Sequence, residues 1–264
     1  MRTVAYCGDH TALTTTKWGA KIYVDTRDTS LAPHIMLEGD WEPWVTNAIA
    51  TVLQQNKGCV FVDVGANVGW YTLLAAHLGA ARIFAIEPNP RLAMLLRRTV
   101  AVNGLRGRAF VRETAAGAAA GKAHLMIDPW EAGGAHLYES SPMPAGSYSQ
   151  LTEPLVAVSR LDDEVLPPNP PLAAAPVTYV VKIDVEGYEP QVLLGAERLL
   201  ALRPVLFIEH HQSITHQGML TVLRDDGYTL HHVQHSGHPG PPLTIEEVMA
   251  IDDAETVLCT PKGA

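Results

Sequence analysis

The stretch FVDVGANVGWYTLLAAHLG, residues 61–79, decides the fold. It continues an apolar and β-branched run, Val60 to Val64, which is typical of a buried strand. A tight turn with Gly65 and Gly69 follows, and a helical pattern of small and apolar residues then closes at Gly79. A strand, a glycine turn and a helix in this order open a nucleotide-binding α/β fold.

Strands and helices alternate through most of the remaining chain. We expect strands at 59–64, 82–86, 108–112, 177–183, 204–209, 228–234 and 255–260, and helices at 68–78, 90–102, 188–200 and 213–225. Residues 1–57 form a leader that caps the domain, and residues 58–264 carry the domain itself. Residues 114–176, rich in Gly, Pro, Ser and Ala, interrupt the alternation. Such an insertion is usually an active-site cover or a disordered loop, and we interpret it as a cover.

Composition and charge limit the class of protein. A chain of 264 residues with 47% hydrophobic and 18% charged residues suits a compact soluble protein. The formal net charge of −9 argues against a nucleic-acid partner. We expect no membrane partner either, because no apolar run reaches the roughly 18 residues that span a bilayer and the N-terminus lacks a signal-peptide core. Three scattered cysteines suggest reduced thiols, so a cytoplasmic enzyme is expected.

The turn D-V-G-A-N-V-G, residues 63–69, bears on the choice of nucleotide. A dinucleotide fingerprint would place glycine where this chain has Asn67, and the chain has no P-loop motif. Asp63 at the strand end suits a cationic ligand better than a pyrophosphate; S-adenosylmethionine carries a sulfonium, an ammonium and no phosphates. Glu87, at the tip of the next strand, can accept both ribose hydroxyls of either kind of cofactor. The turn therefore favours S-adenosylmethionine over a dinucleotide.

Four segments resemble the FkbM family of S-adenosylmethionine-dependent methyltransferases. They are, in this order and spacing, FVDVGANVGWYT, AIEPNP, VVKIDVEGYEPQVLLGAERLL and RPVLFIEHH, preceded by GDWEPWV in the leader. The resemblance covers roughly residues 20–210. It implies a Rossmann-like class I methyltransferase fold, with a seven-stranded, mostly parallel sheet, a reversed final strand and helices on both faces. It also implies methyl transfer, commonly to hydroxyl oxygens of sugars or natural products and in some members to nitrogen.

The family motifs map cofactor-binding roles onto this chain. The residues expected to contact the cofactor are Glu42, Asp63, Gly65, Asn67, Gly69, Glu87, Pro88, Asn89, Glu113 and Thr114. By this match, Glu87 holds the ribose, and Glu113 and Thr114 lie near the adenine. Glu42 would accept from the ammonium group of the methionine end. The tryptophans on either side of Glu42 would form a wall there or, alternatively, a core-facing helix face.

Ionisable residues mark the carboxyl ends of two predicted strands, where sites of this sheet type gather. A hydroxyl acceptor needs a base or a metal to remove its proton. Asp184 is the first candidate, as general base, hydroxyl acceptor or ligand to a divalent cation such as Mg²⁺ shared with Glu209. His210 is a general-base candidate because histidine titrates near neutral pH, although it could equally be an ordinary hydrogen-bonded histidine. The catalytic candidates are therefore Asp184, Glu209 and His210, and the metal stays open.

These observations favour a methyltransferase that acts on a hydroxyl of a sugar or secondary metabolite. N-methylation of a peptide or amide side chain is the alternative, so the acceptor is a small molecule or a peptide. An NAD(P)-dependent oxidoreductase would need a glycine at position 67 and a catalytic Tyr-x-x-x-Lys pair. The chain has neither, which disfavours this class. A binding module without turnover is a further alternative, against which the intact acids Asp63, Glu87, Asp184 and Glu209 count. The leader and the insertion could both serve as contacts in a homodimer.

Overall fold

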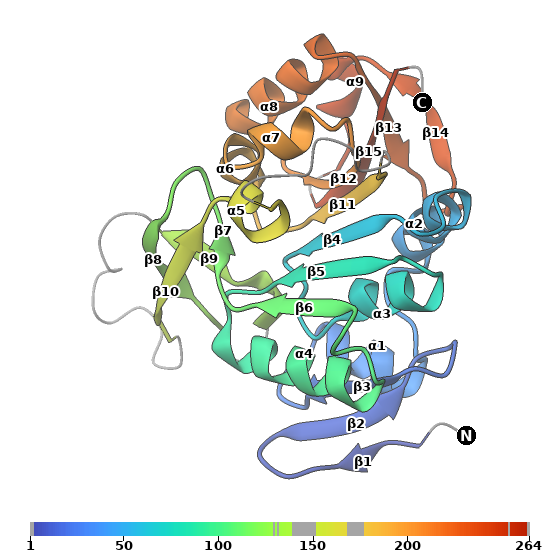
Figure 1. Ribbon diagram of the computed structural model, residues 1–264, viewed down its shortest axis with the longest axis vertical. Coiled ribbons are helices and arrows are strands. Elements are labelled where there is room, and N and C mark those ends of the chain that lie inside the picture. Colours follow the sequence, from blue (N-terminus) through green and yellow to red (C-terminus); the bar gives the residue numbers. More distant parts are fainter. Residues whose placement is uncertain are drawn as a thin grey trace.

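The central feature is one twisted sheet, whose strands lie side by side in Figure 1. The computed structural model describes residues 3–128, 130, 132–138, 152–167, 177–252 and 254–262. In this part of the chain the sheet has eight strands in the order β14–β13–β15–β12–β11–β4–β5–β6. Their bounds are β4 (Val60–Val64), β5 (Arg82–Ile86), β6 (Ala109–Arg112), β11 (Tyr179–Ile183), β12 (Val205–His210), β13 (Tyr228–Val233), β14 (Pro239–Leu243) and β15 (Glu255–Pro261).

The strand directions confirm a mostly parallel sheet with a reversed last strand. Strands β6, β5, β4, β11 and β12 are parallel neighbours. Strand β15 inserts antiparallel between β12 and β13. The sheet exceeds the expected seven strands by β14, which pairs antiparallel with β13. We missed this strand because its sequence is PGPPL, and proline lacks the N–H that a central strand needs. An edge strand tolerates it.

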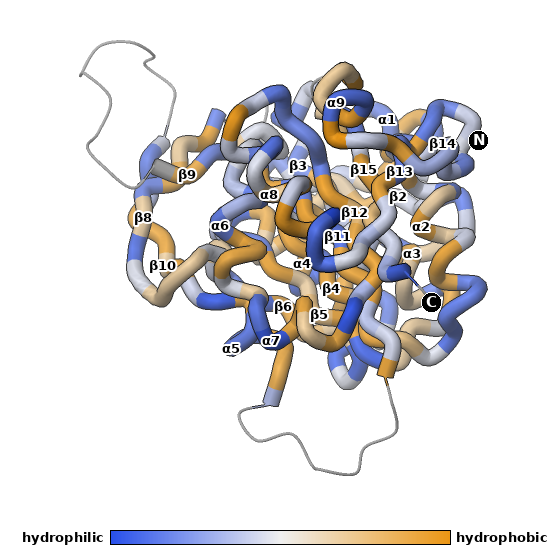
Figure 2. The backbone as a smooth tube through the Cα atoms, turned by 90° about the horizontal axis from the view of Figure 1, so that it is seen from above, coloured by the Kyte–Doolittle hydropathy of each residue, from blue (hydrophilic) through white to orange (hydrophobic). Residues whose placement is uncertain are grey.

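Helices cover both faces, so the inner strands carry apolar residues on both sides (Figures 1 and 2). All five residues of β4 are buried. Phe61 belongs to an apolar cluster with α2 (Pro43–Gln55), α3 (Trp70–His77) and α4 (Pro90–Val102). Its neighbours Val60 and Val62 belong to a second cluster on the opposite face. That cluster contains residues of α5 (Leu161–Val165), α6 (Glu189–Leu194), α7 (Glu197–Leu200), α8 (Ile214–Asp225) and α9 (Ile245–Val248).

The expected single helix over 188–200 is two helices, α6 and α7, separated at Gly195. A Cβ at Gly195 would lie 2.0 Å from the carbonyl oxygen of Gly117, so the helix ends where another backbone segment approaches. Asp162 then caps α7, because its carboxylate accepts from the backbone N–H groups of Arg198 and Leu199 at 3.0 and 2.9 Å. The break is thus set by tertiary contacts that the helical pattern does not contain.

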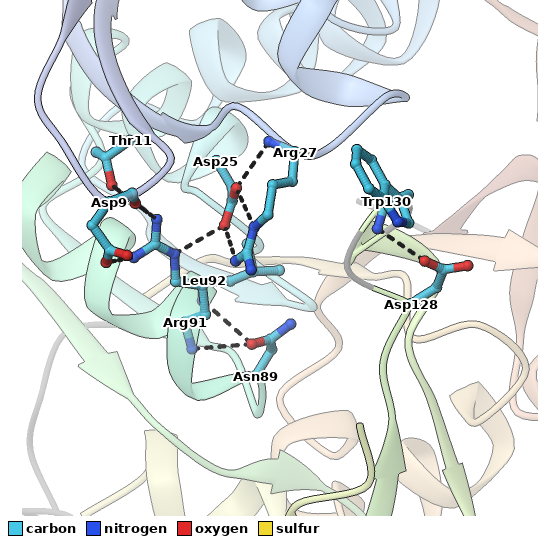
Figure 3. Close-up of polar contacts among 9 residues, drawn as sticks. All are labelled: Asp9, Thr11, Asp25, Arg27, Asn89, Arg91, Leu92, Asp128 and Trp130. Carbon is cyan, nitrogen blue, oxygen red and sulfur yellow. Dashed lines mark hydrogen bonds and ion pairs between the residues drawn. The ribbon is translucent and has the colours of Figure 1, made fainter. Parts of the chain in front are cut away.

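The leader forms a three-stranded antiparallel sheet of β1 (Ala5–Tyr6), β2 (Thr11–Thr15) and β3 (Lys21–Asp25), followed by α1 (Leu31–Leu37). Arg91 of α4 fastens this sheet to the domain (Figure 3). Its guanidinium donates to Asp25 at 2.9 Å, to the Asp9 carboxylate at 2.7 Å and to Thr11 Oγ1 at 2.9 Å. These contacts fix the leader beside the carboxyl end of β5.

The described part of the insertion is a small sheet of its own, in the order β7–β10–β8–β9. Its elements are β7 (Ala115–Ala116), β8 (Gly121–Met126), the 3-10 turn Ala132–Gly134, β9 (His136–Tyr138) and β10 (Leu155–Ser159). Trp130 joins it to the leader, since its carbonyl accepts from Thr29 N–H and Thr29 Oγ1 at 2.9 and 2.8 Å. None of the described helices has the length and apolar character to cross a bilayer.

Candidate active site

A cavity of about 330 Å³ lies where β4, β5, β11 and β12 end. The turns after these strands supply part of its lining, as the position of the site in such sheets requires. The leader residues Asp28, Ser30 and Leu31 and the insertion residues from Gly133 to Leu137 supply another part. The leader and the insertion, which touch through Thr29 and Trp130, therefore complete the cavity together.

The glycine turn after β4 is shaped by its neighbours. Gly65 has a φ of +79°, and a Cβ there would lie 1.8 Å from the Asp184 carbonyl oxygen, so no other residue fits between the turns after β4 and β11. Gly69 has a φ of +96° and precedes α3, and a Cβ there would lie 2.5 Å from Leu96 Cδ1. Gly65 and Asn67 line the cavity, whereas Gly69 lies outside the described lining. Gly69 thus permits the turn and does not face the cavity.

Glu87 lines the cavity at the tip of β5 and is only 5% exposed. Its two carboxylate oxygens accept from Asn67 N–H and Asn89 N–H, each at 2.8 Å. Burial nevertheless raises the pKa of Glu87 to about 7. Pro88 lines the cavity as well, whereas Asn89 turns inward and caps α4 by accepting from Arg91 N–H at 3.0 Å (Figure 3).

Lys182 is a site residue that we did not predict. It lies on β11, lines the cavity and is 4% exposed. Its Nζ forms an ion pair with Asp184 and lies 4.7 Å from the centre of the Tyr71 ring. Burial lowers the pKa of Lys182, but the carboxylates of Asp184 and Glu42 outweigh burial and hold that pKa above its ordinary value. The site therefore contains a permanent positive charge. The signal in the sequence for this site residue was a lysine inside the otherwise apolar run VVKI.

Asp63 is a buried neighbour of Lys182 beneath the cavity. It is fully buried, lies outside the described cavity lining and is the register partner of Lys182 on the neighbouring strand. Thr72 Oγ1 donates to its carboxylate at 2.6 Å, and burial raises its pKa. We expected Asp63 to contact the cofactor; the structure places it outside the described cavity lining, in the layer that supports Lys182.

Glu42 lines the cavity from the leader, where it precedes α2 with a φ of +40°. The Tyr71 hydroxyl donates to its carboxylate at 2.5 Å. Burial, and next the charge of Asp184, raise the pKa of Glu42. Glu42 thus lines the cavity, and its contacts with Tyr71 and the charge of Lys182 depend on the fold.

A second group of ionisable side chains lies at the ends of β11 and β12. One donor atom each of Glu186, Glu209 and His211 lies within 4.8 Å of the other two, an arrangement that could hold a metal ion. Glu209 Oε2 and His211 Nε2 are 3.0 Å apart. A cation shared by Asp184 and Glu209 was one of the roles considered for Asp184. In the structure Asp184 pairs with Lys182, while Glu209 groups with Glu186 and His211.

Three further predicted site residues, besides Asp63, Gly69 and Asn89, lie outside the described lining of the cavity. His210 is 1% exposed, and the centre of its ring lies 6.3 Å from that of His216. It faces the side of the sheet opposite to Glu209, because alternate residues of a strand face opposite sides. Glu113 is ion-paired with Arg97 at the surface. Thr114 is buried and donates to the Ala157 carbonyl at 3.0 Å. We therefore no longer assign His210 the role of general base, and Ala115 and Ala116 line the cavity beyond β6 instead.

The crowded carboxyl groups predict a pH-dependent stability. Burial, and next the charge of Asp184, raise the pKa of Glu209 from 4.5 to about 9. Between these values the unfolded chain has lost this proton and the folded chain retains it, so stability falls as pH rises. Glu209→Gln, which has no charge to bury, should exceed the wild type in unfolding free energy by more than about 1 kcal/mol near pH 9 and by much less near pH 5. Urea denaturation at both pH values measures this, with exposed Glu38→Gln as the control.

Comparisons with known proteins agree with this architecture. The family model described as Methyltransferase FkbM domain matches residues 63–230. Hexuronic acid methyltransferase AglP from Haloferax volcanii is 25% identical over 167 residues, which are 63% of this chain and 62% of AglP. The match thus spans less than two thirds of that relative.

Two solved structures are also similar to this chain. Precorrin-6y C5,15-methyltransferase from Geobacter metallireducens is 15% identical with a TM-score of 0.43, over 82% of this chain and 87% of that one. An O-methyltransferase from Bacillus cereus, solved with SAH, is 12% identical with a TM-score of 0.48, over 84% and 83%.

Proposed function

The chain belongs to the FkbM methyltransferase family, and from this premise we propose that it transfers a methyl group from S-adenosylmethionine to a hydroxyl oxygen of a sugar or a sugar-bearing secondary metabolite. The observation that carries the proposal is the Lys182–Asp184 ion pair in a cavity that also holds Glu87. One end of the cavity then suits a nucleoside and the other supplies a base beside a fixed positive charge.

The donors at the β4 and β5 ends fit S-adenosylmethionine. Glu87 is held by Asn67 and Asn89 so that its remaining lone pairs can accept from two ribose hydroxyls. Glu42 supplies a carboxylate for the ammonium group of the methionine end. When bound, the cofactor supplies a methyl group on a positively charged sulfur. The chain's part is to hold that methyl group in line with the acceptor oxygen.

Asp184 acts as the general base in this proposal. Its Oδ2 contacts Lys182, and its side chain keeps 29% exposure, so the carboxylate can still reach an acceptor hydroxyl. The Lys182 ammonium contacts the Asp184 carboxylate and stabilises the negative charge that develops on the acceptor oxygen. Because Lys182 is buried and surrounded by carboxylates, this charge is in place before the acceptor binds.

The charge of the cavity favours a neutral acceptor. Among the described residues, six carboxyl groups line it, against one lysine and one histidine: Asp28, Glu42, Glu87, Asp184, Glu186 and Glu209, against Lys182 and His136. Glu209 retains its proton up to about pH 9, but another carboxylate brought into this lining would meet the ionised members of the group at short range. We therefore expect neutral sugar hydroxyls to be better acceptors here than hexuronic acids, although the relative AglP carries the latter in its name.

Calorimetric titration with S-adenosylhomocysteine, followed by a panel of acceptors, tests the proposal. The panel contains neutral glycosides, the matching uronic acids and peptide amides, with isotope-labelled S-adenosylmethionine as the methyl donor. Methylation of a neutral glycoside oxygen supports the proposal. Methylation only of peptide amides would replace it by N-methylation, and methylation only of uronic acids would overturn the charge argument.

We expect turnover to survive removal of divalent cations. Asp184 can take the acceptor proton and Lys182 can stabilise the negative charge, so both tasks that a metal would perform have a side chain. The Glu186–Glu209–His211 group also includes an imidazole, which suits transition metals better than Mg²⁺. Assay after dialysis against EDTA checks this. Loss of turnover with recovery on adding Mg²⁺ or Mn²⁺ would instead make these three residues metal ligands.

A further inference from the structure

A buried acid–histidine pair lies behind the acceptor side of the cavity. Glu189 opens α6 and is 0% exposed, and His216 in the first turn of α8 is 1% exposed. Glu189 Oε2 and His216 Nε2 are 3.0 Å apart. Neither residue belongs to the described cavity lining. A carboxylate is costly to bury, so such a pair is weak evidence for stability and points to another use.

Glu189 holds the turn that follows β11. Its other oxygen, Oε1, accepts from Val185 N–H at 2.9 Å and from Gly187 N–H at 3.3 Å. These two amides flank Glu186, whose backbone is left-handed with a φ of +55° and whose side chain lines the cavity. A left-handed non-glycine residue is strained and persists only where its surroundings hold it. The Glu189 carboxylate is such a restraint.

His216 holds the turn that follows β12. Its Nδ1 accepts from His211 N–H at 3.2 Å, which leaves the ring proton to Nε2. Nε2 is in close contact with Glu189 Oε2, but the two atoms are not aligned as a hydrogen bond. The His211 ring in turn lies 3.0 Å from Glu209 Oε2. The pair therefore ties the two turns, one carrying Glu186 and the other following Glu209, through a continuous series of contacts.

We infer that Glu189 and His216 are positioning residues that set the separation of Glu186 and Glu209 on the acceptor side of the cavity. The inference rests on the proposed function for its catalytic readout. In methyl transfer the acceptor oxygen must lie in line with the methyl group, so a shift of the turns should slow the reaction more than it weakens nucleotide binding. The nucleotide end, at β4 and β5, is held by separate contacts through Glu87.

The pair can be broken with little change in shape. In Glu189→Gln the side-chain carbonyl can still accept from Val185, but the amide then faces the N–H of His216, so two donors oppose each other. The ring cannot move its proton without losing the His211 contact. His216→Leu removes both contacts, whereas His216→Gln offers an acceptor and a donor again.

We expect Glu189→Gln and His216→Leu to lower kcat for the acceptor by about 10- to 100-fold and to change the dissociation constant of S-adenosylhomocysteine by less than about threefold. His216→Gln should recover most of kcat. Amide hydrogen exchange at Val185, Gly187 and His211 should accelerate in the two damaging variants and remain slow in the sheet.

Asp162→Asn is the matched control. Asp162 is also buried and also accepts from two backbone amides, those of Arg198 and Leu199, but it lies outside the described lining of the cavity. It should lose unfolding free energy and keep kcat. If Asp162→Asn lowers kcat as much as Glu189→Gln does, or if Glu189→Gln leaves kcat unchanged, the inference is overturned.

The amide exchange separates this inference from the proposed function. If the wild type methylates no member of the acceptor panel, the proposed function fails and only the exchange experiment remains. In that case, faster exchange at Val185, Gly187 and His211 in Glu189→Gln but not in Asp162→Asn supports the positioning role. Unchanged exchange at these three amides overturns it.

Discussion

Replacing Glu87 with alanine should weaken S-adenosylhomocysteine binding by roughly 10²- to 10⁴-fold. In our proposal two ribose hydroxyls donate to this carboxylate, and a hydrogen bond to a charged group contributes about 1.5–3 kcal/mol, so their loss amounts to about 3–6 kcal/mol. The truncation also leaves the amides of Asn67 and Asn89 without their acceptor, which loosens the turn after β4. Calorimetric titration measures the dissociation constant.

Glu113→Ala is the informative control for this experiment. The family motif placed Glu113 near the adenine, but the structure places it outside the described cavity lining, in a surface ion pair with Arg97. The affinity of the Glu113→Ala variant for S-adenosylhomocysteine should equal that of the wild type. A loss in Glu113→Ala together with unchanged binding in Glu87→Ala would mean that the nucleotide lies beyond β6 and would remove Glu87 from the site.

The same carboxyl group makes binding depend on pH. Burial raises the pKa of Glu87 from 4.5 to about 7 in the free protein, and only the ionised form can accept from both hydroxyls. Affinity should therefore be full above pH 7 and fall as the pH drops through 7, by up to tenfold per unit. Near pH 6 binding should release a proton, which titrations in buffers of different ionisation enthalpy detect. Glu87→Gln should abolish this proton release.

The sheet could be predicted because its signals are local. Continuous apolar runs such as Val60–Val64 must be buried on both sides, and a glycine turn after such a run leaves few alternatives. The positions at strand ends followed from the same rule, which is why Glu87, Asp184 and Glu209 all line the cavity. Strand β14 was missed because its pairing compensates for a composition that disfavours strands.

The support of the site could not be predicted, because it depends on register and on packing between distant segments. Asp63 has the position of a ligand-binding acid in the sequence, yet its register partner Lys182 makes it a buried counter-charge. His210 and His211 are adjacent in the chain, but only one of them faces Glu209. Which one does so depends on where β12 ends, and strand ends are not sharp in a sequence.

Asp184→Asn should lower kcat by about 10²- to 10⁴-fold, the usual contribution of a general base. The asparagine amide has the same shape as the carboxylate but cannot take a proton. In this variant the Lys182 ammonium still has the carboxyl groups of Glu42 and Asp63 nearby to balance its charge. S-adenosylhomocysteine affinity should stay within about threefold of the wild type, a difference below ~1 kcal/mol. Steady-state kinetics on an acceptor found in the panel, together with calorimetry, measure both quantities.

Lys182→Met gives a contrasting pattern that makes the assignment of the base specific. Without the ammonium, the carboxyl groups of Asp184, Glu42 and Asp63 repel one another in a buried setting, so the variant should lose unfolding free energy, nucleotide affinity and kcat together. A structural role for Asp184 predicts this combined loss for Asp184→Asn too, because the same ion pair is broken. A base predicts a loss of kcat alone. Equal losses of turnover and affinity in Asp184→Asn would therefore transfer the proton-accepting role away from Asp184.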